Sequence, residues 1–490
     1  MKKILVIGSG LGGLSSAIYL ASEGYDVEIF EKNDKVGGKL NVLERDGFKF
    51  DLGPSIFTMP HIFNELFEKN GRNMEDYFTL KKVNPHWRNF FEDGKKIDLV
   101  PFGKKNKFRV TNVSVKDKRQ LEKFLTYSKA LYDEVEKGYF DKGLDTVKGN
   151  IKEYGPVGLL KDLDAFSTMD SKVRKYIDNE YLINIMNFFI KYVGSSPYNA
   201  PALLNLLPYI QYEFGLWYVE GGMYNLAEGL LKLLEELGVK VHLNSEVVEL
   251  GRSNKRIDSI KLSDGSIVEA DSVLSNMEAI PLYRDVLGMD KTFIQTLDKF
   301  EPTCSGLVIH LALKEEYPQL AHHNFFFSDN PKEHFSTVFE KKEMPDDPTI
   351  YLVAPTRSDE SQAPEGYDNI KILPHIPYIN DNIGPEDYED LKEKVYSKLE
   401  KMGLNNLREN IIFEEILNPF DIQDMYYSNK GSIYGIVSDR NKNLALKMPK
   451  KSTEFENLFF AGGSINPGGG MPMVVLSGIN AAKDIINETK

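Results

Sequence analysis

Six residues near the start of the chain, GSGLGG from Gly8 to Gly13, have the types and spacing of a turn that binds phosphate. Gly8, Gly10 and Gly13 form the pattern G-x-G-x-x-G. In this pattern the first glycine permits a tight turn, the second lets backbone approach a pyrophosphate, and the third lets a helix pack on a strand. Glu31 follows at the distance where a carboxylate accepts hydrogen bonds from ribose hydroxyls. Together these residues predict a dinucleotide site.

A second glycine turn follows in KVGGKL, where Gly37 and Gly38 are backbone-permissive positions. Lys39 comes next and is placed to bring a cation near a phosphate or a flavin. A nicotinamide-binding domain does not ordinarily need such a turn, although a lysine taken alone is typical of a solvated surface. The segment FDLGPSIFTMP then predicts a rigid turn at Gly53 and Pro54, ahead of apolar residues.

The most glycine-dense turn lies near the other end of the chain, in LFFAGGSINPGGGMPMVVLSG from Leu458 to Gly478. It separates an apolar strand-like run from an apolar helix-like run. From the residues alone two interpretations are open. The turn lies against a cofactor that side chains would displace, or it is a surface turn before an amphipathic helix.

The elements around the first turn follow from hydrophobic periodicity. Ile4 to Ile7 predicts a buried parallel strand, and the residues after it change to helical spacing. Gly24 stands where that helix would stop, and Val27 to Phe30 predicts a second strand. The result is a βαβ unit. Its helical face is predicted from Leu14, Ala17, Ile18 and Ala21.

A similar block lies in the middle of the chain. GGMYNLAEGLLKLLEELG predicts a helix with leucines at helical spacing, ended by Gly238. VKVHL, EVVEL, RIDSIKL and SIVEADSVLS predict short strands, with a hairpin turn at Ser263 to Gly265. A long insertion before this block carries an amphipathic helical face at Leu121, Phe124, Leu125, Leu131 and Val135. After Tyr283, strand candidates alternate with a helix around Leu391, Val395 and Met402.

This order predicts a nucleotide-binding domain built from three stretches and interrupted twice. We place its parts at 1–80, 215–282 and 426–490. A helical substrate and membrane region is expected over 81–214, and a substrate domain over 283–425. The chain has 490 residues, more than one hydrophobic core usually supports, so two domains or large insertions are expected.

Composition and charge exclude some classes of partner and site. Hydrophobic residues make up 41% and charged residues 27%, which is typical of a globular protein and not of a disordered one. A net charge of −13 argues against a nucleic-acid partner, because phosphates would be repelled. Cys304 is the single cysteine, so an internal disulfide is impossible and a reducing, cytoplasmic location is favoured.

The first residues, Met1 to Ala21, superficially mimic a signal peptide, but glycines interrupt the apolar run and no convincing cleavage context follows. No run reaches the roughly 18 to 20 apolar residues needed to span a bilayer. We therefore expect membrane contact to be peripheral, at the cytoplasmic face and through apolar surface.

These motifs resemble those of one family over nearly the whole chain. The resemblance lies in IGSGLGGLSSAIYLASEGYDVEIFEKNDKVGGKL, FDLGPSIFTMP, GLWYVEGGMYNLAEGL and NLFFAGGSINPGGGMPMVVLSG. They look like FAD-dependent carotenoid desaturases and oxygenases of the phytoene desaturase type. The segments FIKYVGSS, LWYVEGG, YPQLAHHNFFF, DPTIYLV, NIKILPHIPYI and NPGGGMPMV are most similar to the bacterial branch that oxygenates diaponeurosporene.

The resemblance implies FAD as cofactor and an α/β fold. That fold has a Rossmann-like FAD-binding domain of the flavin amine oxidase and phytoene desaturase type, an inserted α+β substrate domain and a helical membrane-facing region. Relatives often carry arginine where Lys39 stands, and lysine lacks the bidentate fork of arginine. The tail turn would lie beside the flavin, and a helix from Met471 would direct its amides at the pyrimidine end. The implied cofactor-binding residues are Gly8, Gly10, Leu11, Gly12, Gly13, Glu31, Lys32, Gly38, Lys39, Gly53, Pro54, Ser55, Val247, Gly463, Met471 and Met473.

An aromatic supply near the end of the helical insertion suggests an apolar slot for a rod-like polyene. Among these residues Tyr192, Trp217 and Tyr218 are the predicted substrate-binding residues, although each is also typical of an ordinary core. His322 and His323 invite a metal interpretation. Because adjacent residues of a strand point to opposite faces and no carboxylate stands at ligand spacing, we expect no metal.

The implied activity is FAD-dependent oxidation of the terminal methyl group of a thirty-carbon diapocarotenoid, diaponeurosporene or diapolycopene, to an aldehyde. Oxygen would come from dioxygen or water, and no catalytic residue stands out. Two alternatives stay open. One is a desaturase that introduces C=C bonds by hydride transfer to FAD. The other is a non-catalytic prenyl or lipid carrier, against which Glu31 and the complete tail turn argue.

Overall fold

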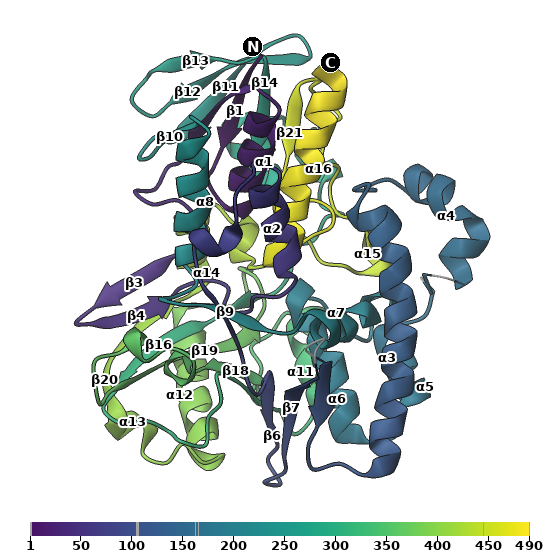
Figure 1. The fold of residues 1–490 in the computed structure, drawn as a ribbon, viewed down its shortest axis with the longest axis vertical. Helices are drawn as coiled ribbons and strands as arrows, with labels where there is room; N and C mark the ends of the chain where they lie inside the picture. Colours follow the sequence, from purple (N-terminus) through teal and green to yellow (C-terminus); the bar gives the residue numbers. More distant parts are fainter. Residues whose placement is uncertain (1, 104–106, 162, 165, 444, 490) are drawn as a thin grey trace.

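The computed structural model describes residues 2–103, 107–161, 163–164, 166–443 and 445–489. In Figure 1 the two ends of the chain meet in the upper part of the molecule. Below them a sheet with green strands lies on one side, and a group of blue helices lies on the other.

The upper part is built on one parallel sheet made from the start, middle and end of the chain. Val6 and its neighbours in the first strand are buried on both faces, which explains the uninterrupted apolar run KILVI. The order predicted from the sequence, with strands from three separated stretches in one sheet, is observed. The strands lie in the order β10 (Lys240–His242), β2 (Asp26–Phe30), β1 (Lys3–Ile7), β14 (Ser272–Ser275) and β21 (Leu458–Phe460).

The two faces of this sheet are covered differently. Ile4 and Val6 pack toward helices, whereas Leu5 and Ile7 pack toward a second, antiparallel sheet. The helices are α1 (Leu11–Ser22), α2 (Pro60–Glu68), α8 (Asn225–Glu236) and α16 (Met471–Thr489). The antiparallel sheet has the order β11 (Val247–Ser253), β12 (Arg256–Leu262) and β13 (Ile267–Glu269). This arrangement is the Rossmann-like fold expected from the sequence, which is confirmed.

One strand prediction in this region needs correction. SIVEADSVLS forms two strands in two different sheets, β13 in the antiparallel sheet and β14 in the parallel one. The change of sheet comes at Ala270 and Asp271. The backbone N–H of Ala270 donates to the carbonyl oxygen of Asp258 in β12, which belongs to the antiparallel sheet. The N–H of Asp271 donates to the carbonyl oxygen of Lys3 in β1, which belongs to the parallel sheet.

The lower sheet is mixed and joins two distant stretches of the chain. Its order is β20 (Ile411–Leu417), β16 (Val308–Leu313), β19 (Asp368–Ile376), β18 (Ile350–Val353), β17 (His323–Phe326), β6 (Trp87–Phe90), β7 (Lys96–Phe102) and β8 (Lys107–Val110), with β15 (Ser305–Gly306) beside β19. β17 and β6 pair in parallel, so β6, β7 and β8 belong to the same sheet as β16 to β20.

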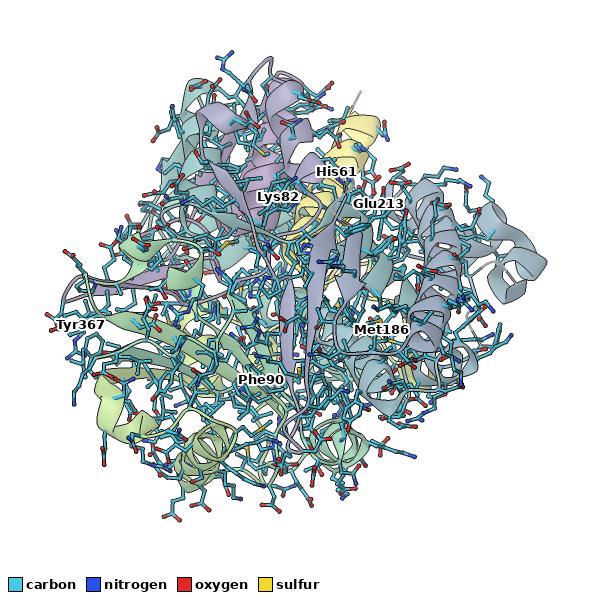
Figure 2. All side chains as sticks on the ribbon, turned by 60° about the horizontal axis from the view of Figure 1, so that its bottom comes forward. His61, Lys82, Phe90, Met186, Glu213 and Tyr367 are labelled. Carbon is cyan, nitrogen blue, oxygen red and sulfur yellow. The ribbon has the colours of Figure 1, made fainter. Side chains whose placement is uncertain are left out.

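Strand alternation divides the aromatic residues of this sheet between two cores. Phe325 and Phe327 face the core shared with the blue helices, whereas Phe326 stacks on Phe90 at 4.6 Å in the core on the other side. Figure 2 labels Phe90 on this sheet and Met186 within the helices, on either side of that division. The three consecutive phenylalanines therefore contribute to two hydrophobic cores, one on each side of the sheet.

The remaining elements connect these layers. They are β3 (Val42–Arg45), β4 (Phe48–Asp51), β5 (Leu80–Lys82), β9 (Trp217–Val219), α9 (Ala279–Pro281), α10 (Lys291–Thr296), α11 (Pro331–Ser336), α12 (Pro385–Lys401), α13 (Leu407–Asn410), α14 (Pro419–Tyr426) and α15 (Arg440–Asn443). The expected helix around Leu391 and Val395 is α12, in which both side chains are buried.

The insertion is helical only in its second part. The helices are α3 (Val115–Val135), α4 (Val147–Lys161), α5 (Met169–Tyr176), α6 (Glu180–Phe188) and α7 (Leu206–Phe214). α3 begins at a capping box between Ser114 and Asp117 and buries the face predicted from Leu121 to Val135. The region expected to be helical, 81–214, instead begins with the strands β6, β7 and β8, whose apolar side chains alternate at a period of two. Within the described residues, no helix is long and apolar enough to cross a membrane.

The close crossing of α1 and α16 requires glycine at position 478. A Cβ at Gly478 would lie 2.4 Å from the Gly12 carbonyl oxygen and 2.2 Å from Ser15 Oγ. We expect Gly478→Ala to lower the free energy of unfolding, because overpacking costs about 1–3 kcal/mol and outweighs the helix-propensity gain of about 1 kcal/mol. Urea denaturation followed by circular dichroism measures the change.

The matched control is Asn487→Ala on the exposed side of the same helix. This substitution raises helix propensity without adding a close contact, so it should leave the free energy of unfolding unchanged or raise it slightly. A Gly478→Ala protein as stable as the control would contradict the close crossing of the two helices.

Candidate functional site

A cavity of about 290 Å³ lies where the first, middle and last segments of the chain meet. It runs between the carboxyl ends of the parallel strands and the lower sheet, the usual position of a ligand in this class of fold. Its lining comprises Gly10, Leu11, Gly37, Lys39, Leu40, Leu52 to Ile56, Thr58, Lys191, Tyr192, Asn276, Glu278, Val308, Tyr351, Lys371, Leu373, Leu417, Ile422, Tyr426, Ile433 to Gly435, Gly462, Gly463, Gly469 to Pro472 and Val474.

The two amino-terminal glycine turns form one unit at the edge of this cavity. Gly10 and Gly37 pair as a parallel bridge, and the Gly37 N–H donates to the Ser9 carbonyl at 2.9 Å. Gly37 and Gly38 have φ of 107° and 59°, a region that favours glycine. A Cβ at Gly53 would lie 1.6 Å from the Lys39 carbonyl oxygen, so the third turn is packed against the second.

Asn276, directly after β14, holds the first and last turns together. A Cβ at Gly10 would lie 2.5 Å from Asn276 Oδ1, and one at Gly12 or Gly462 would lie 2.8 Å from Nδ2. Nδ2 donates to the Ala461 carbonyl at 3.2 Å. Sequence reasoning missed this residue. The available signal was its position just after a parallel strand, where functional side chains of this fold class gather.

The carboxylate of Glu31, at the end of β2, is buried beside the first turn. Oε2 accepts hydrogen bonds from the Ser9 N–H at 2.8 Å and the Ser9 hydroxyl at 2.7 Å. Oε1 accepts from the N–H and Nδ2 of Asn33, both at 3.0 Å. These four bonds use the carboxylate's usual capacity. A ribose diol would therefore displace the Ser9 hydroxyl or the Asn33 amide, both of which can rotate away.

Lys39 reaches the cavity but is paired within the protein. Its Nζ donates to the Ser432 carbonyl at 3.0 Å and lies 3.5 Å from Glu278 Oε1. Burial lowers the pKa of Lys39, and the Glu278 carboxylate opposes that shift. Burial likewise raises the pKa of Glu278, against the effect of Lys39. The pair keeps a cation at the cavity wall.

The tail turn and the start of α16 form the opposite wall. Gly468 and Gly470 have φ of 119° and 98°, and Cβ atoms at Gly463 and Gly469 would lie 3.2 and 2.7 Å from the Tyr434 carbonyl oxygen. Met471, Pro472 and Val474 line the cavity. The amino end of α16, which carries partial positive charge, is therefore at the cavity and favours negative charge there.

The predicted residues divide into those that line the cavity and those that do not. The former are Gly10, Leu11, Lys39, Gly53, Pro54, Ser55, Gly463, Met471 and Tyr192. The remaining predicted residues are absent from its lining: Gly8, Gly12, Gly13, Glu31, Lys32, Gly38, Val247, Met473, Trp217 and Tyr218. Lys32, for example, donates to the Asp424 carbonyl at 2.5 Å and lies over the Tyr427 ring.

Trp217 and Tyr218 lie in β9, outside the cavity. The Trp217 indole N–H donates to the Phe214 carbonyl at 2.8 Å, and the Tyr218 ring lies 5.0 Å from that of His322. The aromatic end of the cavity comes instead from Tyr192, Tyr351 and Tyr434. Sequence reasoning missed the last two because only the tertiary structure brings Tyr351, on β18 of the lower sheet, and Tyr434 to the same cavity.

Lys371 of β19 is a second cation that the sequence did not reveal. Its Nζ donates to the carbonyl oxygens of Asp51 at 2.9 Å and Gly53 at 2.5 Å, fixing the turn before Pro54. Burial lowers the pKa of Lys371 to about 8, and the Asp51 carboxylate opposes this shift. Burial raises the pKa of Asp51 to about 6. An isolated lysine inside a strand was the available signal.

The adjacent histidines differ from the expected arrangement. His322 precedes β17, so the strand rule does not apply, and its ring packs edge-on against that of His323 at 4.4 Å. His322 Nδ1 bonds Ser358 Oγ and His323 Nδ1 bonds the Tyr351 hydroxyl. Throughout the part of the chain that the structure describes, no group of three or more histidine, cysteine, aspartate or glutamate residues could hold a metal ion.

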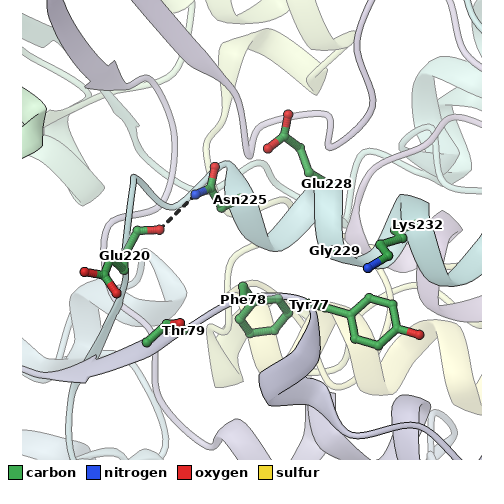
Figure 3. A pocket seen from close by; sticks show the side chains of 8 residues that line it. All are labelled: Tyr77, Phe78, Thr79, Glu220, Asn225, Glu228, Gly229 and Lys232. Atoms are coloured by element: carbon green, nitrogen blue, oxygen red, sulfur yellow. Dashed lines mark hydrogen bonds between the residues drawn. The ribbon is translucent and has the colours of Figure 1, made fainter.

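A second hollow, of about 340 Å³, lies between α8 and the segment 77–79 that leads to β5 (Figure 3). Its lining is Tyr77, Phe78, Thr79, Glu220, Asn225, Glu228, Gly229 and Lys232. The Asn225 amide donates to the Glu220 carbonyl at 2.8 Å, and Lys232 lies over the Tyr77 ring. It shares no lining residue with the glycine-lined cavity.

The residues of the first cavity fit a flavin dinucleotide. Seven glycines expose backbone along its wall, at positions 10, 37, 53, 462, 463, 469 and 470, with an eighth at 435. A helix amino end and a lysine offer favourable partners for anionic groups. The other walls are apolar and aromatic, as a planar ring and an apolar substrate require.

Comparisons with known proteins agree with this fit. Residues 11–486 match the family described as flavin containing amine oxidoreductase. The chain is 54% identical to a 4,4'-diapolycopene oxygenase of Methylomonas sp. over 479 residues, 97% of this chain and 96% of that protein. It is 50% identical to a 4,4'-diaponeurosporene oxygenase of Staphylococcus haemolyticus over 486 residues, 99% of this chain and 97% of that protein. These matches confirm the resemblance inferred from the motifs.

Solved structures share the fold at low sequence identity. A putrescine oxidase bound to putrescine superposes with a TM-score of 0.66 at 13% identity, covering 99% of each chain. The cyclohexylamine oxidase of Brevibacterium oxydans gives a TM-score of 0.59 at 14% identity, covering 100% of this chain and 99% of that one. With the family match over nearly the whole length, the chain belongs to the flavin-containing amine oxidoreductase family, as an oxidoreductase whose cofactor is FAD.

Proposed function

We propose that this protein oxidises the terminal methyl group of a thirty-carbon diapocarotenoid, diaponeurosporene or diapolycopene, to an aldehyde. The observation that carries the proposal is the identity of about half of all residues, over nearly the full length, with two oxygenases of such carotenoids. The shape and lining of the cavity support it, because the wall away from the glycine turns is apolar and aromatic.

The cofactor end of the site is proposed to use the glycine turns and the helix end. Gly10, Gly53 and Gly463 present backbone to the cavity, and a Cβ at these positions would press on Asn276, Lys39 and Tyr434 respectively. The amino end of α16 stabilises negative charge on a neighbouring group. Bound FAD supplies two-electron oxidation. Glu31 is proposed to accept from the ribose, exchanging the Ser9 hydroxyl or the Asn33 amide for ribose hydroxyls.

The substrate end of the cavity is proposed to act by holding the polyene in position and by excluding water. Among the described residues that line the cavity, Glu278 is the one carboxylate and none is a histidine. Glu278 is paired with Lys39, which leaves no free carboxylate beside the substrate. A conjugated hydrocarbon delocalises positive charge and needs little proton transfer, so this lining suits hydride removal from a polyene better than acid–base chemistry.

A peripheral contact with the cytoplasmic face of the membrane that stores the polyene is also proposed. Large apolar side chains are exposed at Phe102, Val115, Val147, Ile151 and Phe166, all within 81–214. They provide apolar surface that a bilayer interface can cover. The net charge of −13 makes attraction to anionic headgroups an unsuitable alternative.

The cofactor assignment is tested at Gly10. Gly10→Ala should weaken FAD binding about ten-fold or more, because overpacking costs about 1–3 kcal/mol. The Cβ would also press on Asn276 Oδ1, so Gly10→Ala/Asn276→Ala separates the two effects. We expect the double variant to bind FAD as weakly as the single one. The measurement is flavin absorbance after gel filtration and titration with FAD.

Full recovery of FAD binding in the double variant would contradict the assignment, because Gly10 would then be needed only to accommodate Asn276. Gly384→Ala is the control. A Cβ there meets no atom closer than 3.9 Å, so FAD binding should be unchanged.

The reaction is tested by product mass. In a bacterium that makes thirty-carbon carotenoids, expression should give pigments that have gained oxygen at a chain end, as alcohol and aldehyde. Growth under labelled dioxygen or in labelled water identifies the oxygen source by mass. Products that have only lost hydrogen would replace the oxygenase proposal with a desaturase and leave the cofactor assignment intact.

The membrane contact is tested with the double variant Phe102→Ser/Phe166→Ser. Burying one phenylalanine side chain contributes about 1.5–3 kcal/mol, so binding to neutral phospholipid vesicles should fall ten-fold or more. Sedimentation with vesicles measures it. Phe420→Ser, an exposed position in α14 outside 81–214, is the control and should bind as the unmodified protein does. Equal binding by all three proteins would contradict this surface.

A further inference from the structure

The aromatic end of the cavity encloses a lysine amine. Lys191 Nζ lies 3.6 Å from the ring centroids of both Trp87 and Phe325. The Tyr192 ring lies 5.1 Å and the Tyr351 ring 5.5 Å from the same nitrogen. Lys191 is 6% exposed and lines the cavity together with Tyr192 and Tyr351, whereas Trp87 and Phe325 are not among the lining residues. We call these four rings the aromatic cage.

The cage is rigid because its members belong to neighbouring strands of one sheet. Trp87, Phe325 and Tyr351 lie on β6, β17 and β18, which are adjacent, and Phe325 and Tyr351 are register partners. The Trp87 indole N–H donates to Gln211 Oε1, and the Tyr351 hydroxyl bonds His323 Nδ1 at 2.9 Å. Lys191 belongs to the short helix Phe189–Val193, and its amine packs against the rings of these strands.

The cavity's other charged groups all have partners. Lys39 is paired with Glu278, and Lys371 donates to two carbonyl oxygens. The phenols near Lys191 are also occupied, because the Tyr192 hydroxyl donates to Gln211 Oε1 at 3.1 Å and the Tyr434 hydroxyl lies 3.4 Å from His375 Nε2. Among the hydrogen bonds and ion pairs of the described residues, none involves Lys191 Nζ, and the contacts at this amine are ring faces.

Burial disfavours the charged form of this amine. No carboxylate opposes the effect of burial, which holds the pKa of Lys191 well below its ordinary value. A buried donor without an acceptor costs about 1–3 kcal/mol, so a ligand that supplies an acceptor gains correspondingly. Ring faces offer only a weak substitute.

We propose that Lys191 is the binding site for the oxygen atom of a partly oxidised polyene end, donating a hydrogen bond to a hydroxyl or aldehyde oxygen that reaches the amine from the cavity. The inference rests on the proposed function and names the intermediate that the site retains. A hydrocarbon end gains nothing from the amine. The first oxidation creates the acceptor, so the alcohol is held for the second oxidation. Because the cage already contains the protein's own amine, it does not accommodate an amine substrate.

The experiment compares two ligands on the FAD-loaded protein. One is a thirty-carbon polyene that carries an aldehyde at one end, and the other carries methyl there. Lys191→Met removes the donor and keeps an apolar chain of similar length. It should weaken binding of the aldehyde-ended polyene about ten-fold and change that of the methyl-ended one less than about two-fold. During turnover it should release more alcohol relative to aldehyde than the unmodified protein does.

Lys175→Met makes the same change at an exposed position of α5 and should leave both affinities unaltered. The proposal is overturned if Lys191→Met lowers the affinities for the aldehyde-ended and the methyl-ended polyene equally, or if it lowers neither. A protein that makes no oxygenated product would overturn the proposed function, yet its ratio of affinities would still decide the role of Lys191.

A second measurement needs no variant. In the unmodified protein the C=O stretch of the bound aldehyde should move to lower frequency, as a hydrogen bond to the carbonyl requires. An unshifted stretch would overturn the proposal. So would loss of the stretch with a covalent mass increase after borohydride, because the amine would then form an imine rather than donate a hydrogen bond.

Discussion

Close backbone contact between the first and last turns of the chain is the constraint on which the site depends. Gly12, Gly462 and Gly478 leave no room for a Cβ where α1, the tail turn and α16 meet. Asn276 fills the remaining space and bonds Ala461. Glycine is therefore required here for contacts within the protein as well as for any bound cofactor. The close packing of these segments therefore also fixes the position of the cavity wall that they form.

The cavity joins two kinds of environment. At one end, exposed backbone, the amino end of a helix and the Lys39–Glu278 pair suit charged groups. At the other end, Tyr192, Tyr351 and Tyr434 line the cavity beside Lys191, a lysine that lacks a polar partner among the described residues. Trp87 of β6 and Phe325 of β17, on neighbouring strands of the mixed lower sheet, pack against the same amine. The charged and the aromatic surroundings thus belong to one cavity.

Sequence reasoning predicted the parts of the fold that short-range patterns determine. The βαβ unit, the leucine face of α8, the face of α3 and the start of α16 follow from periodicity and glycine positions. Contacts that depend on how distant strands pair could not be predicted in this way. Asn276, Lys371 and Tyr351 become wall residues only through sheet order, and Trp217 and Tyr218 lie outside the cavity because β9 pairs with β5. The strands β6, β7 and β8, expected to be helical, are a different case, because their alternating apolar residues were a short-range signal that sequence reasoning missed.

The separation of β1 from β21 and α16 along the chain has a consequence for biosynthesis. β14 has no partner on one side until β21 is made, and α1 has no covering helix until α16 follows. At about 5–20 residues per second, these segments emerge from the ribosome tens of seconds after β1. The parallel sheet therefore stays open at β14 during that time, and its unpaired edge is exposed in the nascent polypeptide. Shielding of that edge by a chaperone would protect the polypeptide from aggregation until β21 pairs with β14.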